Sequence, residues 1–269
     1  MKAPELSSIN RTLGVLRPDE PVGHIMRPLA IEIPIAIEFN GIGYAVMMAT
    51  PTDLQDFAIG FGLSERLITS PRNVVEIEAI EQSEGMILRI ALDPDHMAPI
   101  LDRARQRVSE SSCGLCGLES LEQVMRPLPK ISARPSAIPA ALFAALEALR
   151  DHQPLSVETG AVHGAAFCAH DGTILIARED VGRHNALDKL IGALARGGMD
   201  PASGFILVTA RCSYELVEKT IIAGCPMLVT ISAPTSLAVE RAAAHDLTLI
   251  VLARRDAMLV ANDPAGLYS

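Results

Sequence analysis

Two cysteines separated by two residues are the most chemically specific feature of the sequence. Cys113 and Cys116 lie in a run of small residues, 111–117, that reads Ser-Ser-Cys-Gly-Leu-Cys-Gly. Thiols at this spacing either bind a metal or exchange sulfur and electrons with each other. A structural zinc needs four ligands, and no second pair of Cys or His at short spacing follows Cys116. Thiol chemistry is therefore favoured, with a metal site or an incidental structural pair as the alternatives, and we expect no stoichiometric zinc.

The other three cysteines have less specific surroundings. Cys168 and Cys225 fall in apolar segments, within or just before predicted strands, and are expected in the core. Cys212 lies at a strand-to-helix turn, so that a core position and a role in a site both stay open. Five cysteines is an odd number, which argues against a disulfide framework and fits a reducing cytoplasm.

Four loops of the second half follow successive predicted strands and combine cations with helix-capping residues. In an open α/β sheet the ligand crevice lies beyond the carboxyl ends of the strands, where helix N-termini present free N–H groups. In an acidic protein this convergence predicts a pocket for an anionic, phosphate-bearing ligand. The alternative for each residue is an ordinary helix cap or a surface charge. The candidate contacts are Arg183, His184, Arg211, Ser213, Thr235, Ser236, Arg254 and Arg255.

Two histidines are candidates for the same pocket. His184 has the stronger case, because Arg183 and Asn185 flank it in a segment that reads as a loop. His163 lies among small apolar residues at the start of a predicted strand. A lone histidine there is more often a core or rim residue, but its small neighbours leave space for a ligand.

The elements that position these residues begin with an α+β pattern. Residues 31–39 alternate with period two, and Asn40-Gly41 supplies a hairpin turn before a second strand at 44–48. Pro34 predicts that the first of these strands lies near a sheet edge. Thr52 and Gln55 have capping-box spacing at the start of an amphipathic helix whose apolar stripe runs from Leu54 to Ile68. Strands at 74–80 and 86–92 and a helix after Asp95 then lead to the Cys113 loop.

The second half alternates strands and helices. Its predicted strands after the Asp171-Gly172 hairpin are 205–209, 227–231 and 248–252, with helices between them. This order predicts an α/β sheet, largely parallel in its later part. Four prolines between 125 and 139 deny regular hydrogen bonding and mark a boundary. The predicted domains are an N-terminal α+β domain over 1–125, a linker over 126–139 and an α/β domain over 140–269.

Composition narrows the possible functions. Hydrophobic residues make up 49% and charged residues 20%, with no Trp and three Tyr, so a stacking platform for single-stranded nucleic acid is not expected. The net charge of −9 also opposes binding to a polyphosphate backbone. No apolar run approaches the ~20 residues of a membrane span and no signal peptide is recognisable, so we expect a cytoplasmic protein. The apolar composition favours an oligomeric interface, and a homodimer is expected.

Several stretches of the sequence form one combined pattern. They are 32–41, 59–61, 113–116, 158–163, 178–192 (REDVGRHNALDKLIG) and 211–240, which includes Ser-Ala-Pro-Thr-Ser at 232–236. The combination covers nearly the whole chain beyond the first ~20 residues and is far more specific than any one motif. It resembles the formate dehydrogenase accessory sulfurtransferase family, FdhD or NarQ.

The resemblance implies a cytoplasmic sulfur carrier. Such a protein accepts sulfur as a persulfide from a cysteine desulfurase and passes it to the bis-molybdopterin guanine dinucleotide cofactor, which then enters formate dehydrogenase. The family's pattern puts the persulfide on Cys113, with Cys116 assisting. It also implies a cytidine-deaminase-like α/β sandwich in the second half. The implied cofactor-binding stretch, which would hold the guanine nucleotide moiety, is Leu252, Ala253, Arg254, Arg255, Asp256 and Ala257.

Two other functions compete with sulfur transfer. A zinc deaminase needs a His-x-Glu and a later Pro-Cys-x-x-Cys, but His163 is followed by Gly164 and Ala165 and the cysteine pair precedes it, so deamination is not expected. The alternative function is a non-catalytic chaperone that binds the molybdenum cofactor and hands it on.

Overall fold

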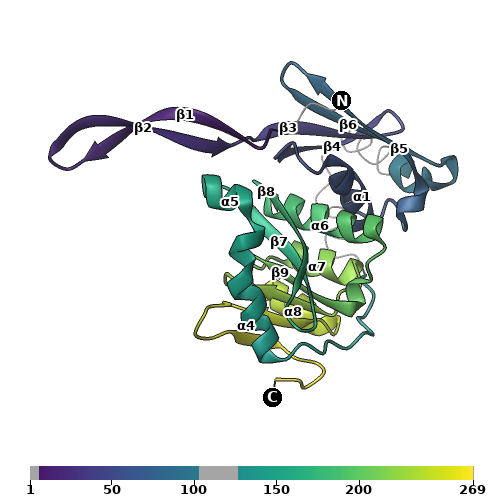
Figure 1. Ribbon diagram of the computed structural model, residues 1–269. Coiled ribbons are helices and arrows are strands. Elements are labelled where there is room, and N and C mark those ends of the chain that lie inside the picture. Colours follow the sequence, from purple (N-terminus) through teal and green to yellow (C-terminus); the bar gives the residue numbers. More distant parts are fainter. Residues whose placement is uncertain (1–5, 103–126, 269) are drawn as a thin grey trace, which may run out of the picture.

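Two β-sheets organise the part of the chain that the computed structural model describes, residues 6–102 and 127–268 (Figure 1). The first sheet has four strands in the order β4-β3-β6-β5. The predicted hairpin is confirmed, with Asn40 and Gly41 at positive φ in its turn. The strands are β3 (Ile33–Phe39), β4 (Ile42–Ala49), β5 (Val74–Gln82) and β6 (Gly85–Leu92).

The prediction that Pro34 marks a sheet edge is wrong. Strand β3 lies between β4 and β6, and the sheet's edges are β4 and β5. The parallel pairing of β3 with β6 begins at Ile35, opposite Met86. Pro34 precedes that ladder, so its missing N–H removes no hydrogen bond to β6 and the proline is tolerated in an interior strand.

Helix α1 (Leu54–Ser64) covers one face of the first sheet. Phe57 and Phe61 are buried there, with Phe61 edge-on to Tyr44 of β4. The predicted capping box is wrong, because Asp53 is the N-cap, at φ 53°, and no side chain caps the helix. Ile68 is also buried, but it follows the helix rather than extending its stripe.

The opposite side of α1 crosses α6 (Arg183–Gly197) at very short range. A Cβ on Gly60 would lie 1.7 Å from the carbonyl oxygen of Asp188, and one on Gly192 would lie 1.8 Å from that of Asp56. Only glycine fits at either position, since both obstacles are backbone atoms. Gly60 therefore serves helix packing, and the sequence Gly60-Phe61-Gly62 is no phosphate loop.

The second sheet has six strands in the order β12-β11-β10-β9-β7-β8. Strands β9, β10 and β11 run parallel as predicted, and β7 is antiparallel to both of its neighbours. The predicted Asp171-Gly172 hairpin joins β7 to β8. The strands are β7 (His163–Ala169), β8 (Ile174–Asp180), β9 (Gly204–Val208), β10 (Met227–Thr230), β11 (Thr248–Val251) and β12 (Leu259–Asn262).

Helices cover both faces of this sheet, which gives a three-layer arrangement of helices, sheet and helices. Along β9, Ile206 and Val208 point into a core shared with α6, α7 (Tyr214–Ile222) and α8 (Ser236–Ala244). Phe205 and Leu207 point into a second core shared with α4 (Pro139–Ala148). The mixed α/β class is as expected, whereas the cytidine-deaminase-like arrangement and the proposed domain limits stay predictions. None of the helices within residues 6–102 and 127–268 is long and apolar enough to cross a membrane.

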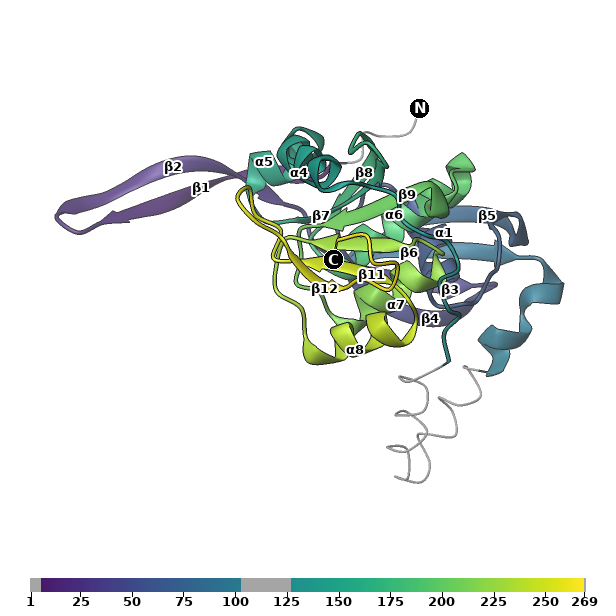
Figure 2. The same ribbon diagram turned by 90° about the horizontal axis from the view of Figure 1, so that it is seen from below.

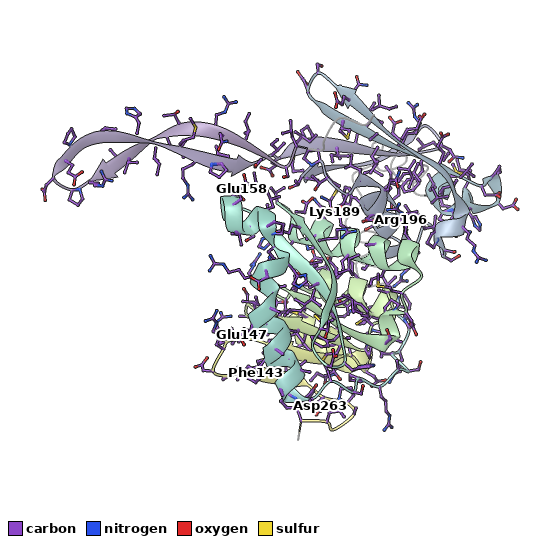
Figure 3. The ribbon with its side chains drawn as sticks, in the orientation of Figure 1. Phe143, Glu147, Glu158, Lys189, Arg196 and Asp263 are labelled. Atoms are coloured by element: carbon purple, nitrogen blue, oxygen red, sulfur yellow. The ribbon has the colours of Figure 1, made fainter. Side chains whose placement is uncertain are left out.

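A buried polar joint links the two sheets. Lys189 of α6 pairs with Asp180 at 2.7 Å, and both side chains are fully buried. Lys189 also donates to the carbonyl of Thr50, and Asp180 accepts from the N–H of Thr50. Asn185 donates to the carbonyl of Met48 at the end of β4. Figure 3 shows Lys189 on α6, facing the first sheet. Three polar residues of the 178–192 run thus hold the two halves together.

A two-stranded antiparallel ribbon, here called the arm, projects from the body (Figures 1 and 2). It consists of β1 (Ser8–Arg17) and β2 (Glu20–Ala30), and β2 leads directly into β3. At its base, the hydroxyl of Ser8 donates to Glu158 of α5 (Pro154–Thr159) at 2.8 Å. Neither the arm nor β12 is predicted by the sequence analysis.

Candidate functional site

The four predicted loops meet at one edge of the second sheet. Strands β8, β9, β10 and β11 all run in the same direction, because β7 is antiparallel to both β8 and β9. The loops that follow them therefore lie at the same end of the sheet, which we call the strand-end edge. His163, the first residue of the oppositely directed β7, lies at this edge too and is paired with Asp180.

Hydrogen bonds tie the loops to one another in series. Thr209, just after β9, accepts from the N–H of Gly164 through its hydroxyl at 2.9 Å and donates its own N–H to the carbonyl of Gly164 at 3.0 Å. Cys212 donates its N–H to Ala233 and accepts from the N–H of Thr235. These bonds fix the spacing of the loops, so the edge is a preformed surface.

Two of the three helices that begin at this edge have no side-chain cap. The N-caps of α6 and α7 are Gly182 and Ser213, and neither makes a side-chain capping bond. Their first-turn N–H groups carry partial positive charge and suit an anion. Helix α8 differs, because the hydroxyl of Thr235 accepts from the N–H of Ala238. Thr235 therefore acts as an ordinary helix cap, the alternative that the sequence left open.

Arg183 and His184 lie in the first turn of α6, and the prediction that they belong to a loop is wrong. The helix begins earlier because Gly182 serves as its N-cap, and Asp180 accepts from the N–H of Gly182 at 2.7 Å. Nε of Arg183 is buried and has no hydrogen-bond partner among the described residues. The Arg183 guanidinium therefore lies at the strand-end edge with an N–H group that is still able to donate a hydrogen bond to a ligand.

The two histidines of the edge are neutral at pH 7. Burial, followed by the charge of Arg183, lowers the pKa of His184 to about 4. Burial and then Arg183 also lower the pKa of His163, although Asp180 acts in the opposite direction. A permanently charged guanidinium beside two neutral imidazoles can bind an anion, and each imidazole can still donate or accept one hydrogen bond.

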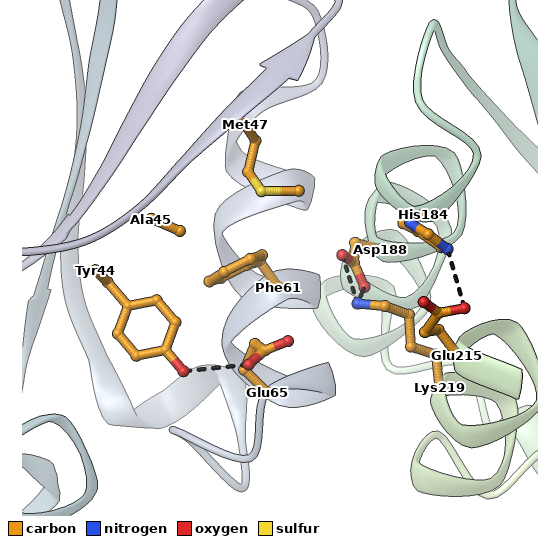
Figure 4. A pocket seen from close by; sticks show the side chains of 9 residues that line it. All are labelled: Tyr44, Ala45, Met47, Phe61, Glu65, His184, Asp188, Glu215 and Lys219. Carbon is orange, nitrogen blue, oxygen red and sulfur yellow. Dashed lines mark hydrogen bonds and ion pairs between the residues drawn. The ribbon is translucent and has the colours of Figure 1, made fainter. Parts of the chain in front are cut away.

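A cavity of about 210 Å³ opens beside His184, between the two halves of the protein (Figure 4). The wall from β4 and α1 includes Tyr44 and Phe61, and the wall from α6 and α7 is charged. In the charged wall, Lys219 pairs with Asp188 at 2.7 Å, and Nε2 of His184 lies 3.6 Å from Glu215. Sequence reasoning missed this cavity. In the sequence, the one local indication of this cavity is that Glu215 and Lys219 lie four residues apart in a predicted helix. The opposite wall of the cavity comes from the first half of the chain, which a local pattern cannot reveal.

The remaining predicted cofactor contacts lie on the outer part of the edge. Arg211, Arg255, Asp256, Ala257 and Ser236 are exposed, and Ala253 is buried in the core on the α4 side. Arg254 is exposed too, but its Nη1 donates to the carbonyls of Ile231 and Ala253. The loop reverses at once after β11, where Leu252 has φ 49°. Such left-handed backbone is uncommon for a branched side chain and turns the following residues back over β10.

The three described cysteines are all buried thiols. Cys168, Cys212 and Cys225 are each 0% exposed and form no disulfide. Burial raises the pKa of each of them to about 12. The core positions predicted for Cys168 and Cys225 are confirmed, and the open question on Cys212 resolves to the core. A thiol that stays protonated at neutral pH is a poor nucleophile.

Cys113 and Cys116 lie outside the described residues, and so does the part of the predicted helix after Asp95 that extends beyond residue 102. Within residues 6–102 and 127–268, no group of three or more His, Cys, Asp and Glu side chains is placed to hold a metal ion. The expected absence of zinc therefore stays a prediction that elemental analysis can test.

Comparison with known proteins gives three consistent results. The model of the FdhD/NarQ family matches residues 30–267. A protein named sulfur carrier protein FdhD from Variovorax paradoxus is 44% identical over 88% of this chain and 85% of its own length. A protein of the same name from Xanthomonas campestris is 45% identical over 89% of this chain and 85% of its own.

A solved structure has the same fold. The crystal structure of a protein from Desulfotalea psychrophila, described provisionally as a formate dehydrogenase accessory protein, superimposes with a TM-score of 0.74. It covers 97% of this chain and 99% of its own at 24% identity.

Proposed function

The chain belongs to the FdhD/NarQ family, and from this premise we propose that it is a sulfur carrier in the maturation of formate dehydrogenase. We further propose that it works in the cytoplasm, receives sulfur from a cysteine desulfurase and delivers it to bis-molybdopterin guanine dinucleotide as its substrate.

The state of the described thiols supports the assignment of the sulfur to the Cys113–Cys116 pair. Cys168, Cys212 and Cys225 are sealed in the two cores of the second sheet, where burial raises the pKa of each thiol to about 12. None of them can become a thiolate or meet a partner protein at neutral pH. Of the five cysteines in the chain, only Cys113 and Cys116 are left for the task.

The proposed chemistry is two thiol exchanges. The Cys113 thiolate attacks the terminal sulfur of a persulfide on the desulfurase, the donor's S–S bond breaks, and the donor cysteine leaves as a thiolate. Cys113 then carries the persulfide, with no net oxidation. Attack of the Cys116 thiolate on Sγ of Cys113 would release the terminal sulfur as hydrosulfide and leave a disulfide between the two residues, which balances atoms and electrons.

The strand-end edge is proposed to hold the guanosine diphosphate part of the cofactor. Its phosphates would face Arg183 and the uncapped first turns of α6 and α7, with Arg211 on the rim. The exposed loop 252–257 would contact the rest of the nucleotide. The buried Nε of Arg183 supports this placement, because a donor without a partner inside a folded protein costs stability unless a ligand satisfies it.

Mass spectrometry tests the carrier function. After incubation with a desulfurase and cysteine, we expect a mass gain of one sulfur atom on the peptide containing Cys113. The Cys113→Ala protein should not gain sulfur or activate formate dehydrogenase, whereas Cys168→Ala should do both. Activation by Cys113→Ala at the wild-type level would refute sulfur transfer and favour a chaperone that only binds the cofactor.

Calorimetry with GDP tests the pocket. Arg183→Ala and Arg211→Ala should weaken binding by about 1 to 3 kcal/mol each, the usual value of a charge-assisted hydrogen bond, and added salt should weaken it further. The matched control is Arg72→Ala, in the turn Pro71–Asn73 near the far end of α6, which should bind like the wild type. If Arg183→Ala and Arg211→Ala bind GDP as tightly as the wild type and the control do, the nucleotide site is not at this edge. That result would leave the persulfide test unaffected.

A further inference from the structure

Strand β4 is an edge strand whose sequence does nothing to block pairing with another chain. It forms one edge of the first sheet, and β5 forms the other (Figure 1). Natural edge strands are usually protected by charged residues, by proline or by a covering segment. Strand β5 contains three glutamates, whereas β4 reads Ile-Gly-Tyr-Ala-Val-Met-Met-Ala and has neither a charge nor a proline. A long uncharged edge of this kind is a template for an added strand.

The backbone of Val46 faces away from β3. In an antiparallel pair, successive residues point their N–H and C=O groups alternately toward the partner strand and away from it. The carbonyl of Met48 accepts from Asn185, and its cross-strand partner Pro34 has no N–H, so the backbone groups of Met48 point away from β3. Val46 lies two residues earlier and has the same orientation. It therefore offers an N–H and a C=O to a strand added at this edge.

The cavity of Figure 4 lies beside the same edge. Tyr44, Ala45 and Met47 of β4 line it, together with residues of α1, α6 and α7. Directly opposed residues of neighbouring strands point to the same face of a sheet. A residue of an added strand that lies opposite Ala45 would therefore point toward the cavity. The volume of about 210 Å³ is below the range of about 300 to 1,000 Å³ for sites that hold whole small molecules, and it suits one side chain.

The charges around this cavity favour a cation. Among the described residues, three carboxylates line it, those of Glu65, Asp188 and Glu215, together with a single ammonium group. The ammonium group, on Lys219, pairs with Asp188 at 2.7 Å. Glu215 lies in the first turn of α7, where the helix dipole favours its charged form. His184 adds no positive charge at pH 7, because burial lowers its pKa to about 4. Negative charge is therefore in excess.

The aromatic wall of the cavity suits a guanidinium group. The rings of Tyr44 and Phe61 line it from β4 and α1. An arginine side chain can place its apolar stem and its planar head against such rings while its N–H groups donate to carboxylates. The hydroxyl of Tyr44 donates to Glu65 at 3.1 Å and so orients that carboxylate. A carboxylate has about four acceptor positions, so Glu65 can accept from a ligand as well.

We propose that the free edge of β4 binds an extended segment of a partner protein, and that one arginine of this segment enters the cavity, where Glu65 and Glu215 bind its guanidinium. The added strand exchanges N–H···O=C bonds with Val46. The residues on either side of the arginine point to the opposite face of the sheet, where the side chain of Val46 is 68% exposed, and are therefore aliphatic. In such strand addition, main-chain hydrogen bonds supply affinity and the pocket supplies specificity.

Fluorescence anisotropy with a labelled peptide tests the cavity on the full chain. The probe is acetyl-Thr-Val-Arg-Val-Thr-amide, and the matched control peptide has glutamate in place of arginine. The wild type should bind the probe at least about tenfold more tightly than the control peptide, because a carboxylate in the cavity meets like charges. Glu215→Gln should weaken binding of the probe about fivefold or more. Glu78→Gln, on the protected edge strand β5, should leave it unchanged.

Two substitutions at Val46 test the strand pairing. Val46→Pro removes the outward N–H, and proline is tolerated where an edge strand faces solvent. This variant should keep the circular dichroism of the wild type and bind the probe at least about tenfold more weakly. Val46→Thr keeps both the N–H and the branched side chain and should bind like the wild type. A benzophenone group in place of one valine of the probe should crosslink to β4.

Four outcomes would overturn the proposal. They are no binding of the probe to the wild type at millimolar protein concentration, equal binding of the two peptides, unchanged binding to Val46→Pro, and crosslinks only to elements away from β4 and the cavity. A different sedimentation coefficient for Val46→Pro would also overturn it, because a second copy of the chain would then cover this edge. None of these measurements involves sulfur or GDP, so their outcome is independent of the proposed carrier function.

Discussion

Acid should destabilise the protein through His184. This residue lies in the first turn of α6, 28% exposed, with Arg183 and Lys219 as neighbouring cations and Glu215 as its nearest anion. Burial and then Arg183 lower its pKa from 6.5 to about 4. In the unfolded chain the imidazole regains its ordinary pKa. Below pH 6.5 His184 therefore binds a proton in the unfolded state but stays neutral in the folded state. As a result, the free energy of unfolding falls as pH falls from about 6.5 to 4.

The size of the effect follows from the two pKa values. Between pH 7.5 and pH 5, a histidine with pKa 6.5 unfolded and about 4 folded loses about 2 kcal/mol of unfolding free energy. The side chain is partly open to solvent, so screening reduces this to about 1 kcal/mol. That loss is a substantial part of the ~5 to 15 kcal/mol that holds a typical domain folded.

Urea unfolding at the two pH values measures it. The wild type should lose about 1 kcal/mol more than His184→Gln between pH 7.5 and pH 5, because glutamine keeps the polar contact but cannot be protonated. His24→Gln, a substitution on the exposed arm, is the control and should behave like the wild type. Equal acid sensitivity in His184→Gln and the wild type would refute a neutral, buried His184.

Substitutions at three further positions, Lys189, Gly60 and Leu252, test the packing that supports the site. Lys189→Met should lower the free energy of unfolding by about 3 to 5 kcal/mol in urea titration, because it leaves Asp180 buried without its partner. Gly60→Ala should cost about 2 to 3 kcal/mol or more through the clash between α1 and α6, whereas Gly43→Ala, with open space around it, should cost less than about 1 kcal/mol. At Leu252 the usual order should invert, with Leu252→Gly about 1 kcal/mol more stable than Leu252→Ala in thermal melts, because only glycine relieves the left-handed backbone. Equal melting of the two Leu252 variants would contradict that strain.

The three parallel strands of the second sheet, β9, β10 and β11, were predictable because they are short apolar runs closed by strong turn signals. Residues 227–231 were predicted as a strand and Met227–Thr230 is observed, between a glycine-ended helix and the Ala-Pro turn before α8. Burial on both faces leaves such a strand without polar positions, which separates it clearly from its flanking loops.

The arm was not predictable on the same grounds. Its strands carry prolines at positions 21 and 28 and mix aliphatic with charged residues. The alternation of aliphatic and polar side chains can be recognised only once the pairing of the two strands, with Leu13 opposite Ile25, is known. The capping box at Thr52 failed for a related reason, because local spacing favoured it while the tertiary contact between Gln55 and Arg196 drew the side chain elsewhere.

The sequence predicted that the four loops meet at one edge of the second sheet, and it predicted only part of the contacts around that edge. The positions of Arg183, Arg211 and Ser213 follow from strand–helix alternation, which brings the ends of parallel strands to one edge. The role of Asp180 and Lys189 could not follow, because their partner Thr50 is about 130 residues away in the chain. A polar residue that binds a ligand and one that joins two halves look alike in a sequence.

The buried polar joint formed by Asp180, Asn185 and Lys189 fixes the relative positions of the two halves that line the candidate site. Helix α6 presents Arg183 and His184 in its first turn. Asn185, in the same turn, donates to the carbonyl of Met48 at the end of β4, and Lys189, about one turn further along, donates to the carbonyl of Thr50 just after that strand. These hydrogen bonds hold Tyr44 and Phe61 opposite His184, across the cavity of Figure 4. Any shift of the first sheet against α6 would therefore move the apolar wall and the cationic edge relative to each other. The buried ion pair, costly to desolvate, is best understood as the device that fixes this register.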